Sequence, residues 1–186
     1  MALTAKSPIE ELHERPGFLI RRAQQIAVAL FLEETGALGI TNTQYGILLV
    51  LKNRPGIDQI SVARLLGLDR STTGMVLGKL EKAGLVGRHV EKHDRRKRNL
   101  ALTLAGEHML EQLVEPARRA QARVLSAFSA EERTDFLRLL EKFVGKFNHS
   151  TRVPLASQRA NGVRADRRRL PKAAVASDQS KGHRIT

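Results

Sequence analysis

The sequence contains no cysteine and no tryptophan, and it has a single tyrosine among 186 residues. The lack of cysteine excludes disulfide bonds, thiol-based redox sensing, and zinc or iron–sulfur sites with cysteine ligands. With one Tyr and six Phe, the core must be filled mainly by aliphatic side chains. No apolar run approaches the roughly 20 residues that span a bilayer, and the first residues lack the apolar centre of a signal peptide. We therefore expect a cytoplasmic protein without a membrane partner.

Catalytic and metal-binding motifs are missing as well. The six histidines are scattered, and no two of them lie four residues apart on an expected helix, so we expect no metal site. No Ser/His/Asp motif, P-loop or GxGxxG pattern is visible. We expect neither an enzyme nor a bound cofactor.

Positive charge is what the chain has in excess. The formal net charge of +13 indicates an anionic partner, either nucleic acid or an acidic membrane surface. Residues 70–98 contain nine Lys/Arg against three Asp/Glu, and residues 151–186 contain nine against two. Because the terminal segment lacks aromatic or amphipathic character, the pattern favours nucleic acid over a lipid anchor.

Apolar residues at helical spacing, bounded by capping residues and by glycine or proline, predict six helices. Asp58, Asp69 and Ser129 are the expected caps of three of them, the last within a capping box. Pro116 should kink the fifth helix. The six helices cover residues 16–35, 41–53, 58–66, 70–83, 103–127 and 129–147. Side chains expected to face the core include Ile60, Met75 and Leu104.

After the fourth helix the apolar pattern changes period. Leu85–Val90 and Arg98–Leu102 are typical of two strands, joined by a charged turn over residues 91–97. Residues 1–15 show no clear period and are expected to form a flexible N-terminus. Residues 151–186 cannot bury enough apolar area to offset the entropy of ordering, so we expect a disordered basic tail.

Three short helices followed by a hairpin predict a winged helix-turn-helix. In such proteins the second helix of the pair enters the major groove with its N-terminal residues first. Arginine can reach guanine or phosphate there, and hydroxyl groups can serve base edges or phosphate oxygens. The expected DNA contacts on this helix are Arg70, Ser71, Thr72, Thr73 and Lys79. Gly74 and Gly78 either permit close approach to DNA or to the neighbouring helix, or are merely tolerated.

The expected hairpin tip holds five cations within residues 92–98. A short β-ribbon with arginine at its tip can enter the adjacent minor groove, where narrow A·T tracts concentrate negative potential. The candidates for this contact are Arg95, Arg96 and Arg98. Asp94 is expected to pair with one of these arginines and hold the turn rigid. The alternative is a solvated charged turn without a partner.

The stretch Ile57–Gly106 resembles the DNA-binding core of the MarR regulators. The resemblance rests on VARLLGLDRST from Val62, on LEKAGLV from Leu80, and on the wing pattern D-x-R followed by L-x-L-T-x-x-G from Asp94. It extends over about residues 8–150 and leaves out the tail. It implies that Arg96 is the wing arginine with Asp94 as its support. It also implies a two-fold dimer on a pseudo-palindromic operator, usually acting as a repressor.

We therefore expect a mainly α protein with a small β-hairpin wing, in which a winged helix-turn-helix is joined to a helical dimerisation domain. The MarR-type domain covers residues 16–150, with the winged helix-turn-helix at 41–102 and dimerisation helices at 16–38 and 103–150. The flanking helices carry broad apolar faces that need a partner surface. A symmetric homodimer supplies one, unless these helices simply cover one another.

An effector site is expected near the first two helices, because relatives in this family usually bind effectors between the dimerisation and winged domains. The candidate residues are Phe18, Arg21, Arg22, Gln25 and Tyr45. Arg22 could pair with a ligand carboxylate or phosphate, and Tyr45 could stack or donate a hydrogen bond. In the alternative interpretation Arg22 forms an inter-subunit salt bridge and Tyr45 belongs to the core.

The sequence from Arg15 to Ala23 is similar to a MarR subgroup that controls aromatic-acid catabolism and senses hydroxylated nicotinate or aromatic acyl-CoA thioesters. This similarity implies a ligand-responsive repressor of an aromatic-compound catabolic operon, with double-stranded DNA, a second copy of the chain and a small aromatic acid or its CoA thioester as partners. The alternatives are a constitutive or architectural DNA-binding protein, or an activator, without an effector.

Overall fold

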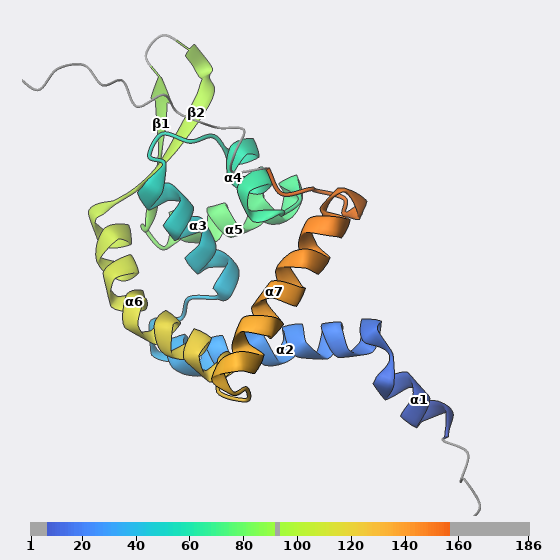
Figure 1. Cartoon of the computed structure of the whole chain (residues 1–186). Helices are drawn as coiled ribbons and strands as arrows, with labels where there is room; N and C mark the ends of the chain where they lie inside the picture. The colour runs from blue at the N-terminus through green and yellow to red at the C-terminus, as the bar shows by residue number, and fades with distance from the viewer. Residues whose placement is uncertain (1–6, 92–93, 157–186) are drawn as a thin grey trace, which may run out of the picture. The chain divides into compact units, whose positions relative to one another are not determined.

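The structure is a computed structural model that describes residues 7–91 and 94–156 (Figure 1). The side chains from His89 to Arg98 lie outside this description. The described chain is mainly helical with one antiparallel hairpin, which confirms the expected fold class. The elements in chain order are α1 (Pro8–Glu14), α2 (Pro16–Thr35), η1 (Gly36–Leu38), α3 (Asn42–Asn53), α4 (Gln59–Leu66), α5 (Arg70–Lys82), β1 (Val86–Glu91), β2 (Asp94–Leu102), α6 (Leu104–Leu125), α7 (Ala130–Phe147) and η2 (Asn148–Ser150).

Helix α1 lies where no regular structure was expected. The Ser7 hydroxyl accepts a hydrogen bond from the Glu10 amide at 3.3 Å, and the Ser7 amide donates to the Glu10 carboxylate at 2.6 Å. Pro8 stands at the first helical position, where its missing N–H would have been unpaired anyway. The expectation of an irregular N-terminus is therefore wrong for residues 8–14, because Ser7 and Glu10 form a capping box. The flexibility of this end stays a prediction.

The expected starts of α3, α4, α5 and α7 are confirmed by their capping geometry, whereas α2 starts without a side-chain cap. Asp58 accepts hydrogen bonds from two first-turn amides of α4 at 2.8 and 3.0 Å. Asp69 accepts one from the first turn of α5 at 2.8 Å. Thr41 and Ser129 form capping boxes at the starts of α3 and α7. Each of these side chains satisfies an amide that the first turn of a helix leaves free, so the helix starts are set locally.

Helices α3, α4 and α5, the hairpin and the first half of α6 enclose one apolar core. We call this region, residues 40–113, the winged half. Side chains exposed by 1% or less in this core are Ile47, Leu48, Leu51, Val62, Leu77, Leu80, Leu100 and Leu113. The winged half is thus closed around its own side chains.

Three apolar side chains expected to face the core do not. Ile60 is 50% exposed, Met75 is 59% exposed and Leu104 is 86% exposed. Helical spacing groups residues on faces, but the elements packed around the helix decide which face turns inward. The expectation of burial is wrong at these positions for that reason.

The hairpin is longer and more firmly tied than expected. Strands β1 and β2 pair antiparallel, with a register shift after Val90. Strand β2 begins at Asp94 rather than at Arg98, so part of the expected charged turn continues the ladder. The Leu100 amide donates to the Ile57 carbonyl at 2.9 Å, which ties the hairpin to the loop before α4.

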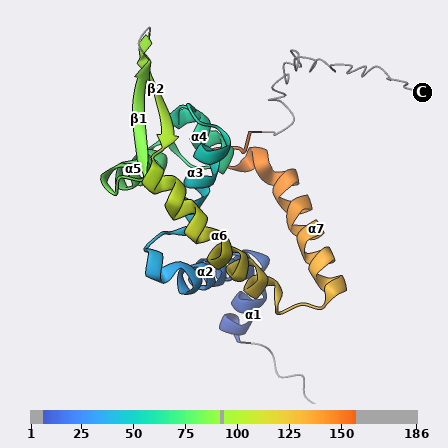
Figure 2. The same cartoon turned by 90° about the vertical axis from the view of Figure 1, so that its left-hand side faces the viewer.

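Beyond the winged half, α2 packs along α6 (Figure 2). Phe31 of α2 is buried with Ala117 and Ala120 of α6, and the ring of Tyr45 lies 5.7 Å from that of Phe31. Helix α6 continues through Pro116, and the expected kink stays a prediction. The face of α2 that carries Phe31 is therefore covered by the chain itself, whereas Ile26 and Leu32 stay 47% and 43% exposed.

Helix α7 has no buried residue. It runs from the end of α6 back towards α4 (Figures 1 and 2). Apart from Phe136, which is partly buried and stacks on Phe128, the large apolar side chains of α7 are 41–52% exposed, namely Leu137, Leu139, Leu140, Phe143, Val144 and Phe147. This helix therefore presents an apolar face that the described residues do not cover.

A short strap, residues 148–156, connects the end of α7 to α4. The side chain of Asn148 holds the backbone of Leu155, with its Oδ1 accepting from the amide at 2.8 Å and its Nδ2 donating to the carbonyl at 3.1 Å. The amide of Ala156 donates to the carbonyl of Arg64 at 3.0 Å. This bond satisfies a carbonyl in the last turn of α4.

The strap corrects the expected start of the disordered tail, residues 151–186. Residues 151–156 belong to the folded part, because Leu155 bonds to the side chain of Asn148 directly after α7, and Ala156 bonds to α4. Residues 157–186 lie outside the described residues. Among the described helices, none combines the length and apolar character needed to cross a membrane.

Candidate nucleic-acid interface and effector region

Helix α5 follows α4 across a turn at Gly67, whose φ is 63°, and it has two different faces. The buried face carries Thr73, Val76, Leu77 and Leu80. The exposed face carries Arg70, Ser71, Met75, Lys79 and Lys82. Three of the side chains predicted to contact DNA, those of Arg70, Ser71 and Lys79, therefore lie on solvent-exposed positions of one helix.

Thr73 was predicted to contact DNA, and its burial contradicts that prediction. Its side chain is 0% exposed, and its hydroxyl donates to the Asp69 carbonyl at 2.8 Å. Thr73 is therefore committed to the core at the start of α5. The neighbouring Thr72 is half-buried, and its contact with DNA stays a prediction.

Thr72 and Asp69 together fix the first turn of α5. The Thr72 amide donates to Asp69 Oδ1 at 2.8 Å, and the Thr72 hydroxyl donates to Asp69 Oδ2 at 2.6 Å. These bonds hold the pKa of the Asp69 carboxyl below its ordinary value of 3.8, and the hydroxyl contributes most to the shift. The carboxylate stays ionised at the helix N-terminus, where a negative charge favours the helix dipole.

The two glycines of α5 differ in their surroundings. A Cβ added at Gly74 would lie 3.1 Å from Nε2 of Gln59, whose side chain also donates to the Arg70 carbonyl at 3.3 Å. Close packing on the neighbouring helix therefore accounts for Gly74. At Gly78 an added Cβ would meet nothing within 4 Å, so packing among the described residues does not account for this glycine.

Strand β2 carries the predicted wing residues, Asp94, Arg95, Arg96 and Arg98. Their side chains lie outside the described part of the chain, so their roles stay predictions. At the base of the hairpin, Arg88 of β1 forms an ion pair with Glu81 of α5. Because both side chains are about 28–29% exposed, this pair links the hairpin to α5 at the edge of the core.

A tight joint connects α5, the hairpin and α6. The Thr103 hydroxyl donates to the Gly84 carbonyl at 2.6 Å and accepts from the Gly106 amide at 3.0 Å. A Cβ at Gly106 would lie 2.0 Å from the carbonyl oxygen of Leu85, which no side chain can tolerate without a shift of the backbone. The T-x-x-G part of the sequence motif signalled this joint, although the sequence did not reveal its geometry.

The predicted effector residues fall into two groups. The first lies on the first half of α2 and consists of Phe18, Arg21, Arg22 and Gln25. In it, the Arg21 guanidinium lies 5.0 Å from the centre of the Phe18 ring, and both arginines donate to Gln25 Oε1 at 3.3 and 3.4 Å. Tyr45 lies apart on α3 beside Phe31, which is about 14 Å along α2 from Arg22.

Within one chain the structure does not bring Arg22 and Tyr45 to a common site. Tyr45 is half-buried and packs against the core, in agreement with the structural alternative. The side chains of Arg21 and Arg22 are exposed on α2. Their role in binding an effector stays a prediction.

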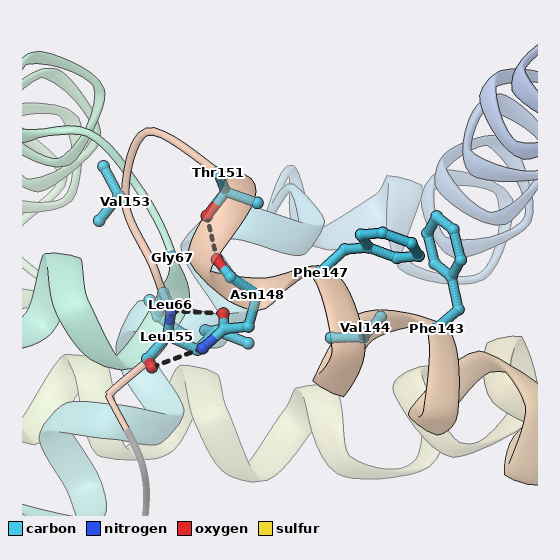
Figure 3. Close-up of a pocket in the computed structure, with 9 residues that line it drawn as sticks. All are labelled: Leu66, Gly67, Phe143, Val144, Phe147, Asn148, Thr151, Val153 and Leu155. Carbon is cyan, nitrogen blue, oxygen red and sulfur yellow. Dashed lines mark hydrogen bonds between the residues drawn. The ribbon is translucent and has the colours of Figure 1, made fainter.

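Two cavities border the turn between α4 and α5, and both include Leu66. The larger one, of about 280 Å³, lies between α7, the strap and the end of α4 (Figure 3). It is lined by Leu66, Gly67, Phe143, Val144, Phe147, Asn148, Thr151, Val153 and Leu155. The other, of about 270 Å³, is lined by Asn42, Thr43, Gly46, Leu66 and Leu68. The predicted effector residues line neither cavity.

The larger cavity is mainly apolar. The rings of Phe143 and Phe147 lie 5.2 Å apart, and the polar groups of Asn148 already bond to Leu155. Among the described residues, no charged side chain lines this cavity, so they offer no partner there for an acidic ligand. In the part of the chain that the structure describes, no cluster of three His, Asp or Glu side chains could hold a metal ion.

Comparison with known proteins relates the chain to a family of regulators. A family model described as MarR family matches residues 38–97. A putative transcriptional regulatory protein for the hcr operon of Thauera aromatica is 32% identical over 127 residues, which cover 68% of this chain and 76% of that protein.

Solved structures of two regulators are similar over most of their length. The transcriptional repressor CouR, solved on a 23-mer DNA duplex, is 29% identical with a TM-score of 0.67, covering 75% of this chain and 99% of that one. BpsR of Bordetella bronchiseptica, whose DNA binding is regulated by 6-hydroxynicotinic acid, is 27% identical with a TM-score of 0.66, covering 70% and 94%.

Proposed function

The chain belongs to the MarR family of transcriptional regulators, and from this membership we propose that it represses an operon as a DNA-binding homodimer that an aromatic ligand releases. The exposed face of α5 carries the proposal, because it presents Arg70, Ser71 and Lys79 to solvent while Val76, Leu77 and Leu80 anchor the helix in the core. A rigid helix with such a face suits the major groove.

The hairpin complements α5 in this proposal. Arg96 enters the adjacent minor groove with Arg95 and Arg98 beside it, and Asp94 supports the wing. The ion pair between Arg88 and Glu81 fixes the hairpin base against α5. Helix α5 and the hairpin are therefore held in a fixed position relative to each other. Residues 157–186, with eight Lys/Arg against two Asp/Glu, add affinity that does not depend on sequence.

The homodimer is proposed from the uncovered apolar faces. Helix α7 exposes Leu140, Phe143 and Phe147, and the first half of α2 exposes Leu19 and Ile20, all by 41–52%. Apolar surface of this extent on several helices marks an interface. A two-fold axis lets the same surfaces of two copies cover one another, and it matches a pseudo-palindromic operator.

The effector is proposed to be a small aromatic acid or its CoA thioester. The support for an acid comes from the related BpsR, whose DNA binding is regulated by 6-hydroxynicotinic acid. The thioester rests on the resemblance of Arg15–Ala23 to the aromatic-acid subgroup. In this chain Arg21 and Arg22 offer exposed guanidinium groups beside Phe18. These groups can pair with a carboxylate or phosphate while the ring of Phe18 contacts an aromatic ligand.

Fluorescence anisotropy tests this function directly. The full chain is titrated against a labelled duplex from upstream of its own gene and against a scrambled duplex, and aromatic acids and their CoA esters are then added. We expect tighter binding to the upstream duplex and release by one ligand class. A complex that resists every ligand would favour a constitutive DNA-binding protein, and equal affinity for both duplexes would favour an architectural one.

Deletion of residues 157–186 separates the tail from the reading elements. We expect the preference for the upstream duplex to remain and the affinity for the scrambled duplex to fall. A changed sequence preference would contradict the assignment of specificity to α5 and the hairpin.

A further inference from the structure

The exposed face of α5 contains one large apolar side chain. Met75 is 59% exposed and lies one helical turn after Ser71 and one turn before Lys79. The sequence places it on a helix whose core positions are already filled by Val76, Leu77 and Leu80. Met75 is therefore not needed to complete the core, and its thioether projects from a face that is otherwise polar and basic.

The major groove offers a single apolar group among its base edges. Guanine, cytosine and adenine present hydrogen-bond donors and acceptors there, whereas thymine also presents its C5-methyl group. Methionine suits such a contact because its side chain is flexible and its sulfur is polarisable. The cations Arg70 and Lys79 on the same face favour a polyanion over an apolar protein surface as the occupant.

Gly78 supports the same contact. It lies three residues after Met75, and an added Cβ would meet nothing within 4 Å. A glycine inside a helix costs about 1 kcal/mol relative to alanine. At Gly74 the close approach of Gln59 explains the residue, whereas at Gly78 no neighbour within the described part of the chain does. If a wall of the DNA groove approaches the helix backbone beside Met75, a glycine at position 78 leaves room for it.

We propose that Met75 contacts the C5-methyl group of a thymine in the major groove and so determines part of the operator sequence, an inference that rests on the proposed DNA-binding function. Met75 acts in this proposal as a specificity residue, while Arg70 and Lys79 supply affinity. Its contribution belongs to one base position and disappears when that methyl group is absent.

The test uses the full chain and a duplex that the wild-type protein selects from a random-sequence library. Each thymine is replaced in turn by deoxyuridine, which removes only the methyl group. We expect one replacement to weaken wild-type binding about fivefold. Met75→Ala should lose about the same factor on the thymine duplex, and it should lose nothing further on the uracil duplex.

Two variants serve as matched controls. Met75→Leu keeps an apolar side chain and should retain the discrimination between thymine and uracil. Leu104→Ala removes an exposed apolar side chain outside α5 and should leave the discrimination between thymine and uracil unchanged. If Met75→Ala weakened binding by the same factor on the thymine duplex and on every uracil duplex, the proposed role of Met75 would be overturned. The proposed DNA-binding function would remain. If the wild-type chain selects no duplex, the proposed function itself fails and this inference fails with it.

Discussion

In the winged half, Leu48, Leu77 and Leu113 are fully buried, whereas Leu139 and Phe143 on α7 are 52% and 47% exposed. Both regions are rich in large apolar residues, so composition does not separate them. The difference is that α3, α4, α5 and the hairpin face one another, while α7 contacts the winged half mainly through the strap. The winged half is complete within one chain, and α7 requires a surface from elsewhere.

Helix α2 combines both situations along its length. Phe31 in its second half is buried against α6, whereas Leu19 and Ile20 in its first half are 52% and 48% exposed. The alternative in which the flanking helices cover one another therefore holds only for the Phe31 face of α2, since Ile26 and Leu32 beside it are 47% and 43% exposed. The rest of α2 and α7 remain available for the proposed dimer.

The largest expected effect comes from opening the core of the winged half. Leu48→Ala should lower the free energy of unfolding by about 2–5 kcal/mol, because it removes a fully buried side chain and leaves a cavity. Urea denaturation measures the loss, and Leu104→Ala, at 86% exposure, should change it by less than about 0.5 kcal/mol. If the two variants lost similar amounts of unfolding free energy, the distinction between buried and exposed leucines would be contradicted.

The joint at Gly106 should be the next most sensitive point. Gly106→Ala should cost about 1–3 kcal/mol of stability, because its Cβ would collide with the Leu85 carbonyl. Gly17→Ala provides the control in the first turn of α2, where an added Cβ meets open space. We expect that variant to be neutral or slightly stabilised in thermal unfolding. An equally stable Gly106→Ala variant would show that the joint can relax.

On α7 the expected loss concerns association. Phe143→Ala should raise the dissociation constant of the dimer at least about tenfold, or about 1.4 kcal/mol, because the ring is half-exposed in one chain and covered in the proposed dimer. Sedimentation equilibrium measures the constant, with Lys146→Ala as a control on the same helix. An unchanged constant would place the interface on other helices.

Arg96→Ala should affect DNA binding and leave the dimer intact. The slope of log K against log[salt] should fall in magnitude by about one, because one phosphate or minor-groove contact no longer releases counterions. Anisotropy titrations over a range of salt concentrations report this slope. Arg138→Ala, which removes a cation paired with Asp135 on α7, should leave the slope as it is. The same slope in all three proteins would refute the wing assignment.

The smallest expected effect is a pKa shift at the start of α5. Hydrogen bonds from Thr72 hold the pKa of Asp69 below 3.8, so Thr72→Val should move it upward, as an NMR titration of the carboxyl group can follow. With a lowered folded-state pKa, the stabilisation by Asp69 is present above pH 3.8 and is lost as the pH falls through the folded-state value. Ser129, the matching cap of α7, carries a hydroxyl and should show no such titration.

Local signals in the sequence were sufficient for the helix starts and for the winged fold. Asp58, Asp69 and Ser129 each satisfy amides a few residues away, so the information lies within one turn. The same capping signal is present at Ser7 and Glu10, but the stretch that follows it is too short for apolar periodicity to appear.

Decisions that depend on distant contacts could not be predicted from the sequence. Thr73 and Met75 lie two residues apart, and only the packing of α5 on α3 and α4 turns the first inward and the second outward. The separation of Arg22 from Tyr45 depends likewise on where α3 meets α2. The strap could not be predicted from sequence pattern, because it is held by a few single contacts, such as those between Asn148 and Leu155.

The joint at Thr103 and Gly106 also has a consequence for the geometry of a dimer. There is no room for even a methyl group between α6 and the Leu85 carbonyl. Helix α6 and the hairpin must therefore move as one rigid unit. In a two-fold dimer the distance between the two wings would then follow the tilt of α6. A small change in that tilt would alter the half-site spacing that the protein can span.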